Sequence, residues 1–200
     1  MKKYLSLLSA FLLVHFARAQ QKNEYQISLN GFAGSEKEIP FWMQSNQNGT
    51  VRNLDHASII GQWRYRQNQD STSSWNLLAG ATLLGFTESE RNKIEINSAY
   101  LSLQYRGLLL TLGSRQTTVE YGGLSSSNGN IIWSGNARPV PGIWLETSHY
   151  LPVPFTRNKL QFTARFGNGI LTDDRWVEDA QLHHKSLFFK WAINPTNELI

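Results

Sequence analysis

Aromatic rings and planar polar groups gather between residues 116 and 147 of this sequence. Tryptophan and tyrosine rings stack on the C–H faces of sugars, while amide, guanidinium and carboxylate groups hydrogen-bond sugar hydroxyls. Charged sugars add a need for arginine. The sequence therefore predicts a glycan-binding site, with candidates Tyr121, Trp133, Asn136, Arg138, Trp144 and Glu146, and in a second loop Asp173, Asp174, Arg175 and Trp176.

A different interpretation of the same residues stays open. Tryptophans also form aromatic girdles where a protein meets a membrane interface, and loop charges are commonly solvated without binding anything. For any single tryptophan this second interpretation is favoured.

Metal and catalytic chemistry have little support in the sequence. The adjacent residues His183 and His184 would point to opposite sides of a strand, so one metal ion could not take both. His184 and Lys190 are instead expected to form hydrogen bonds inside the fold. The acidic stretch "TDDRWVED" lacks calcium-loop spacing, and neither a nucleophile elbow nor a phosphate loop occurs. We expect a protein that is not an enzyme and holds no cofactor.

The first nineteen residues have the pattern of a secretory signal peptide. Lys2 and Lys3 precede an apolar stretch that ends near Phe16, and "ARA" at 17–19 fits a cleavage site. The apolar stretch is too short to span a bilayer as a helix. Residues 1–19 are thus predicted to be a signal peptide, and residues 20–200 the exported domain.

The net charge of +4 belongs largely to that leader. Subtracting Lys2, Lys3 and Arg18 from the 19 basic residues leaves 16 against 15 acidic ones, a balance of +1. This argues against nucleic acid as a partner. With no cysteine, the exported chain has neither disulfides nor thiolate metal ligands.

The exported part alternates between apolar and polar residues in long segments, which is typical of β-strands. The expected strands are 25–34, 57–67, 74–86, 95–106, 108–115, 142–150, 159–170 and 182–192. Most are about as long as the nine to eleven residues of a tilted membrane strand, whereas soluble strands average about five or six. Arginine and lysine recur on one side of them, where a dry core would exclude charge.

The connections alternate in length, which favours an outer-membrane barrel over a soluble sandwich. Arg106-Gly107 is a tight turn, while most alternate connections (35–56, 87–94, 116–141 and 171–181) are longer. Segment 35–56 is expected to act as a loop or plug. The residues predicted for the plug and lumen are Phe41, Trp42, Gln44, Arg64, Arg165 and His184.

We therefore predict an all-β fold, an antiparallel transmembrane β-barrel of the outer-membrane type. The final residues, "AINPTNELI", read as a turn and not as a closing aromatic strand. The expectation is that this chain is the N-terminal part of a larger barrel.

Several stretches taken together resemble the Wzi capsule-assembly family in its Bacteroidetes form. They are "PFWMQSNQNGTV" (40–51), "SGNARPVPGIWLET" (134–147), "LPVPF" (151–155) and "VEDAQLHHKSLFFK" (177–190). The resemblance implies a non-enzymatic barrel in the outer membrane of a Gram-negative cell, and we expect it to be a monomer. Its implied partners are capsular or surface polysaccharide, bound in a lectin-like way, and outer-membrane lipid.

Two other functions stay open at this point. One is a porin-like diffusion channel whose lumenal arginines select anions. The other is a soluble periplasmic β-sandwich that binds glycans, or an enzyme acting on them, with its apolar faces buried between two sheets.

Overall fold

The computed structural model describes residues 20–31, 45–51, 57–68, 75–88, 91–116, 133–172, 176–192 and 198–199. No helix capable of spanning a bilayer occurs among them. The described residues form the strands β1 (Gln20–Gly31), β2 (Ala57–Asn68), β3 (Trp75–Glu88), β4 (Arg91–Tyr105), β5 (Leu108–Ser114), β6 (Gly142–Thr147), β7 (Leu151–Pro152), β8 (Leu160–Leu171), β9 (Ala180–Ala192) and β10 (Glu198–Leu199).

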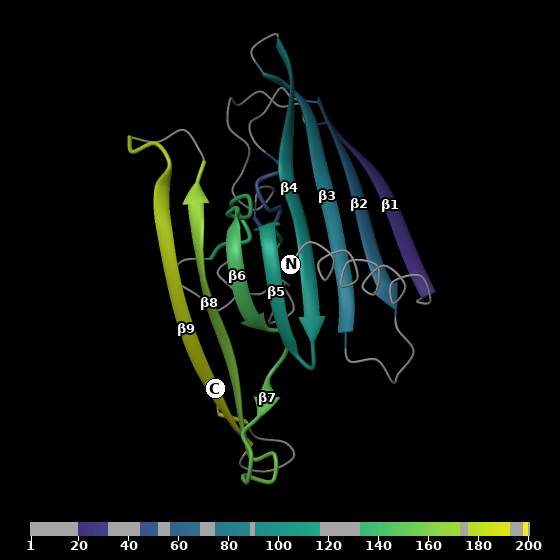
Figure 1. Cartoon of the computed structure of the whole chain (residues 1–200). Coiled ribbons are helices and arrows are strands. Elements are labelled where there is room, and N and C mark those ends of the chain that lie inside the picture. Colours follow the sequence, from purple (N-terminus) through teal and green to yellow (C-terminus); the bar gives the residue numbers. More distant parts are fainter. Residues whose placement is uncertain are drawn as a thin grey trace, which may run out of the picture.

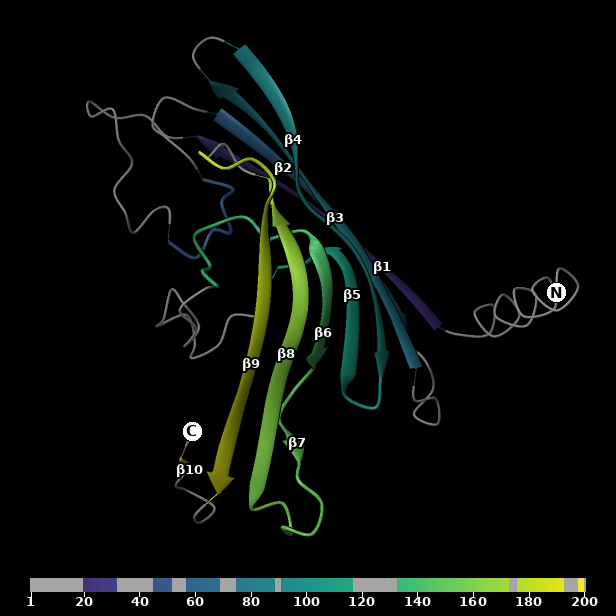
Figure 2. The same cartoon turned by 60° about the vertical axis from the view of Figure 1, so that its left-hand side comes forward.

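All ten strands belong to one antiparallel sheet, whose neighbours follow the order of the chain. The path runs β1-β2-β3-β4-β5-β6-β8-β9-β10, with β7 paired to β8 beside it. Figures 1 and 2 show a twisted, curved sheet in which long strands stand side by side. The prediction of an all-β antiparallel fold is confirmed. In the described residues the sheet is open, because β1 and β10 end the path without pairing to each other.

The strand boundaries agree with the expected ones to within a few residues at most ends. The main difference concerns the connection expected at 87–94. β3 continues to Glu88 and β4 begins at Arg91, so only residues 89 and 90 join them. The bounds 87–94 expected for this connection are therefore too wide, because both strands extend beyond the apolar stretches that mark them in the sequence. Strand 142–150 is shorter than expected and ends at Thr147.

One side of the sheet carries exposed apolar side chains, and no described element packs over them. We call it the apolar face. On β1 the side chains of Tyr25, Ile27 and Leu29 are 75–77% exposed. The face continues across the sheet through exposed residues that include Ile59, Trp63, Leu83, Leu101, Leu108, Leu110, Leu112, Ile143, Leu145, Phe166, Leu187, Phe189 and Trp191.

A β-bulge in β4 keeps this face continuous. Leu83 pairs with Ile96, but the preceding residue Thr82 pairs with Ser98, so Asn97 is an extra residue. Before Asn97 the even-numbered Ile94 and Ile96 lie on the apolar face, and after it odd-numbered residues do. Without the bulge, strict alternation would place the apolar side chains from one half of β4 on the opposite face of the sheet.

The opposite side, which we call the polar face, contains buried hydroxyl pairs. The Ser98 hydroxyl donates to Thr82 Oγ1 at 2.9 Å, joining β4 to β3. Ser102 Oγ and Thr111 Oγ1 lie 2.8 Å apart across β4 and β5, and both residues are almost fully buried. The polarity is thus inverted relative to a soluble protein, since polar groups are enclosed and apolar groups are exposed.

A small apolar cluster also lies on the polar face. It consists of Ile60, Leu84 and Phe86, which are buried together on β2 and β3. This cluster explains why the segment 74–86 is apolar on both sides. Its odd-numbered residues lie on the apolar face, and its even-numbered residues include Leu84 and Phe86 of the cluster.

The Ser102–Thr111 pair provides a test of the buried polar face. Replacing Ser102 with alanine leaves the Thr111 hydroxyl buried without its partner. We expect the free energy of unfolding to fall by about 1–3 kcal/mol, the usual cost of an unsatisfied buried polar group. The double variant Ser102→Ala/Thr111→Val should recover most of that loss. Urea unfolding followed by tryptophan fluorescence in detergent micelles measures both, and equal losses would contradict the pairing.

Candidate functional site

Two arginines, a glutamate and two tryptophans meet at the centre of the polar face. We call Arg115, Trp133, Trp144, Glu146 and Arg165 the arginine–tryptophan cluster. The register between β6 and β8 brings two of these residues together, because Glu146 on β6 pairs directly with Arg165 on β8. Arg115 follows the end of β5, and Trp133 belongs to the segment that leads into β6. Residues far apart in the sequence therefore share one site.

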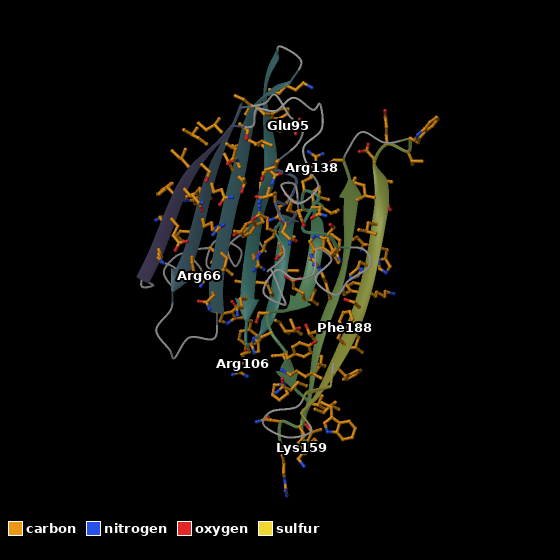
Figure 3. The ribbon with its side chains drawn as sticks, turned by 180° about the vertical axis from the view of Figure 1, so that it is seen from behind. Arg66, Glu95, Arg106, Arg138, Lys159 and Phe188 are labelled. Atoms are coloured by element: carbon orange, nitrogen blue, oxygen red, sulfur yellow. The ribbon has the colours of Figure 1, made fainter. Side chains whose placement is uncertain are left out.

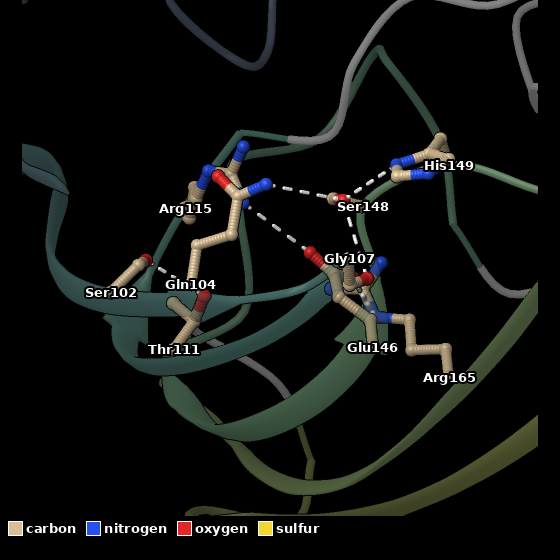
Figure 4. Close-up of polar contacts among 9 residues, drawn as sticks. All are labelled: Ser102, Gln104, Gly107, Thr111, Arg115, Glu146, Ser148, His149 and Arg165. Carbon is tan, nitrogen blue, oxygen red and sulfur yellow. Dashed lines mark hydrogen bonds and ion pairs between the residues drawn. The ribbon is translucent and has the colours of Figure 1, made fainter. Parts of the chain in front are cut away.

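Glu146 bridges the two arginines. Arg115 Nη1 lies 3.4 Å from Glu146 Oε1, and Arg165 Nε lies 3.3 Å from Glu146 Oε2 (Figure 4). The Arg165 side chain is only 15% exposed, and the other two side chains are less than a third exposed. One carboxylate between two guanidiniums leaves this group with a net positive charge.

Trp144 is buried because β8 has no side chains where its ring lies. A Cβ atom built on Gly167 would come within 2.5 Å of the Trp144 ring, and one built on Gly169 within 2.6 Å. The indole therefore lies across two glycines and is 1% exposed. Its Nε1 atom has no hydrogen-bond partner among the described residues.

Arg165 stacks on both tryptophans of the cluster. Its guanidinium carbon lies 4.0 Å from the centre of the Trp133 ring and 5.1 Å from that of Trp144. The two indoles meet edge to face at 4.9 Å, and His184 touches Trp133 in the same manner at 5.5 Å. Arginine is suited to this position, because its flat guanidinium can stack and form an ion pair at once.

A second group of polar contacts lies nearer the ends of the strands where β4 begins. Arg138 donates to the Thr172 carbonyl oxygen at 2.8 Å and lies 3.9 Å from Glu95. Figure 3 shows Arg138 and Glu95 close together at this end of the sheet, with Arg66 toward the other end. Segments 133–141 and 171–172 are thereby tied to β4.

Residues 45–51 are held against this second group. The Asn48 N–H donates to the Gly135 carbonyl at 2.6 Å, and the Asn46 N–H donates to Asn136 Oδ1 at 2.8 Å. The side-chain amide of the bulge residue Asn97 donates to the Asn48 carbonyl at 3.3 Å. The described part of the expected plug segment therefore lies against the polar side of the sheet.

Charge is distributed very unequally between the two faces. On the apolar face, among described side chains, the charged residue is Lys185, near Phe166. The polar face and the segments held to it carry the acidic residues Glu24, Glu95 and Glu146, and the basic residues Lys22, Arg64, Arg66, Lys93, Arg115, Arg138, Arg165 and Lys190. In the part of the chain that the structure describes, eight basic groups against three acidic ones leave this face with an excess of five positive charges.

The structure brings some of the candidate residues together and separates others. Trp133, Trp144, Glu146 and Arg165 share the cluster, and His184 adjoins it through Trp133. Asn136 and Arg138 belong to the second group. His184 Nε2 lies 3.1 Å from Ser186 Oγ.

The remaining candidates lie elsewhere or outside the described residues. Arg64 is on β2, where it donates to Gln62 at 3.1 Å, and Trp176 is fully exposed. The candidates outside the described residues are Phe41, Trp42, Gln44, Tyr121, Asp173, Asp174 and Arg175.

Sequence reasoning did not identify Arg115 as a site residue, because it sits at the start of a long connection. Its role depends on Glu146, which is 31 residues away. Gly167 and Gly169 offered a usable signal, since alternate glycines in a strand leave room for a large ring on one face.

No group of three or more potential metal ligands occurs among the described residues. A scan against family models and searches of curated proteins and of solved structures found no match to this chain.

The bridging role of Glu146 can be tested directly. Replacing Glu146 with glutamine leaves two guanidiniums close together without an anion between them. We expect the free energy of unfolding to fall by about 1.5–3 kcal/mol, as for hydrogen bonds to charged groups. Urea unfolding measures this loss. The control is Glu146→Gln/Arg115→Gln, which removes one of the two like charges and should be more stable than the single variant; an additive effect would contradict the bridge.

Proposed function

We propose that this chain forms the wall of an outer-membrane β-barrel that binds a surface polysaccharide and helps to retain it at the cell surface. The observation that carries the proposal is the inverted polarity of the sheet. Its apolar face is exposed across its whole width, while hydroxyl pairs and charged groups lie on the other side. Lipid outside and a polar lumen inside account for both faces.

Strand length and the outward aromatics support a membrane setting. β1, β2, β3, β4, β8 and β9 have 12 to 15 residues, enough to cross a bilayer at a tilt. Trp75 and Tyr105 face outward at the ends of β3 and β4, with ring centres 4.2 Å apart. Trp191 occupies a similar place on β9. Aromatic residues at strand ends are typical of an interfacial girdle.

The proposal requires the two edges of the sheet to be paired. An unpaired edge in lipid would leave backbone N–H and C=O groups without partners, at a cost of several kcal/mol each in order of magnitude. We propose that further strands join β1 to the β9–β10 edge and so close the barrel.

Polysaccharide binding is proposed from the arginine–tryptophan cluster and the resemblance to the Wzi family. Aromatic rings, guanidiniums and a carboxylate on one polar surface are the groups that sugar recognition uses. Residues 45–51 and 133–138 also lie on the polar side, which speaks for a filled lumen and against an open diffusion channel. Bilayer conductance separates these two functions.

Cell fractionation followed by gel electrophoresis, with and without boiling, tests the barrel. We expect the protein in the outer-membrane fraction, and faster migration of the unboiled sample, because closed barrels resist unfolding by detergent. Recovery in the soluble periplasmic fraction with unchanged migration would favour a β-sandwich instead.

Arginine scanning of the two faces provides a residue-level test. Leu110→Arg places a charge on the apolar face two residues beyond Leu108, which pairs with Tyr105. In lipid we expect a loss of about 1–2 kcal/mol, between the values for the interface and for the bilayer centre. Gln104→Arg is the matched control, because Gln104 lies in the same hairpin on the polar face. Unfolding in lipid vesicles should distinguish the two variants. Equal stability would mean that the apolar face does not meet lipid.

A further inference from the structure

The charge on the polar face narrows the kind of polysaccharide that would bind. Resting on the function proposed above, we propose that the ligand is an acidic polysaccharide whose sugar carboxylates are bound by the arginines of the polar face. Among the described side chains, this face and its attached segments carry five more positive than negative groups, while the charged residue on the apolar face is Lys185. The charge is therefore segregated toward the surface on which the ligand would lie.

The cluster at the centre of this face is suited to a carboxylate. Glu146 already shows that a carboxylate fits between the two guanidiniums, in contact with Arg115 and Arg165. The Arg115 guanidinium also lies 5.9 Å from the centre of the Tyr100 ring. Because Arg115 is the more exposed of the two arginines, it can contact a second carboxylate, from a ligand, beside an aromatic ring that can pack on the sugar.

Further basic groups extend the positive surface away from the cluster. Arg64 and Arg66 on β2 are both exposed on the polar face. Glu24 pairs across from Arg64, and Lys22 pairs across from Arg66, so three positive charges accompany one negative charge there. A chain of repeating acidic sugars could contact this region and the cluster at once, whereas a single small anion could not.

Aromatic residues favour an acidic glycan over a simple anion. Lys190 Nζ lies 5.6 Å from the centre of the Tyr150 ring, and the Arg115 guanidinium lies near the Tyr100 ring. Each pair combines a flat ring with a positive charge, which matches a sugar ring that carries a carboxylate. The occurrence of two such pairs on the polar face supports a glycan over a simple anion such as phosphate.

The test compares one sugar chain with and without its charge. Oligogalacturonides are titrated by calorimetry into the detergent-solubilised protein at low and at physiological salt, and the fully methyl-esterified oligosaccharides serve as the uncharged control. We expect the acidic form to bind at least about tenfold more tightly at low salt, with the difference shrinking as salt screens the charges.

A pair of matched variants tests the location. Arg64→Gln/Arg66→Gln removes two charges from the polar face, while Arg157→Gln/Lys159→Gln removes two exposed charges from the turn before β8 (Figure 3 labels Arg66 and Lys159). We expect the first variant to lose about fivefold in affinity for the acidic form or more, and the second to lose less than about twofold. Tm comparison confirms that both fold.

The outcomes separate this inference from the proposed function. Equal binding of the acidic and esterified forms would overturn the acidic ligand and leave polysaccharide binding in place. Equal losses from the two double variants would overturn its location on the polar face. Binding of neither form, by a protein that still behaves as a barrel, would overturn both the acidic ligand and the polysaccharide function.

Discussion

The whole arrangement depends on the separation of apolar and polar side chains between the two faces of a single sheet. In a strand, successive side chains point to opposite sides, so a shift of one residue would exchange the two faces. Each long strand of this protein keeps most of its leucines, isoleucines and aromatic residues on one side. Where β4 would lose this order, the extra residue Asn97 restores it. No described element covers the resulting apolar face, so the described sheet is a single layer with its apolar side chains exposed.

The polar face is stabilised in a different way from an ordinary core. Among the described residues, its interior contacts are hydroxyl pairs, an ion-pair bridge and cation–π stacking, beside one small apolar cluster. Such contacts have little net value when exposed to water, but they become costly to break once they are enclosed. Glu146 is important in this respect, because it is the acidic group that holds Arg115 and Arg165 beside each other.

The same bulge residue links the sheet to its attached segments. Asn97 corrects the register of β4, and its amide also donates to Asn48 in segment 45–51. That segment contacts residues 135 and 136, and Arg138 continues the connection to Glu95 and Thr172. The bulge in β4 therefore helps to position segments 45–51 and 133–138 on the polar face. Bulges in β-proteins commonly redirect a side chain in this way.

The sequence by itself determined the all-β architecture, most strand boundaries and the identity of the apolar face. These follow from local alternation of residue types, which a strand converts directly into two faces. It did not determine the longer extent of β3 and β4, the bulge at Asn97, or the roles of Arg115, Gly167 and Gly169. Those features depend on which residue of one strand lies opposite which residue of the next. Glu146 meets Arg165 and Trp144 lies over Gly167 only because β6 pairs with β8 in one register, and pairing between distant segments is decided by the folded sheet as a whole.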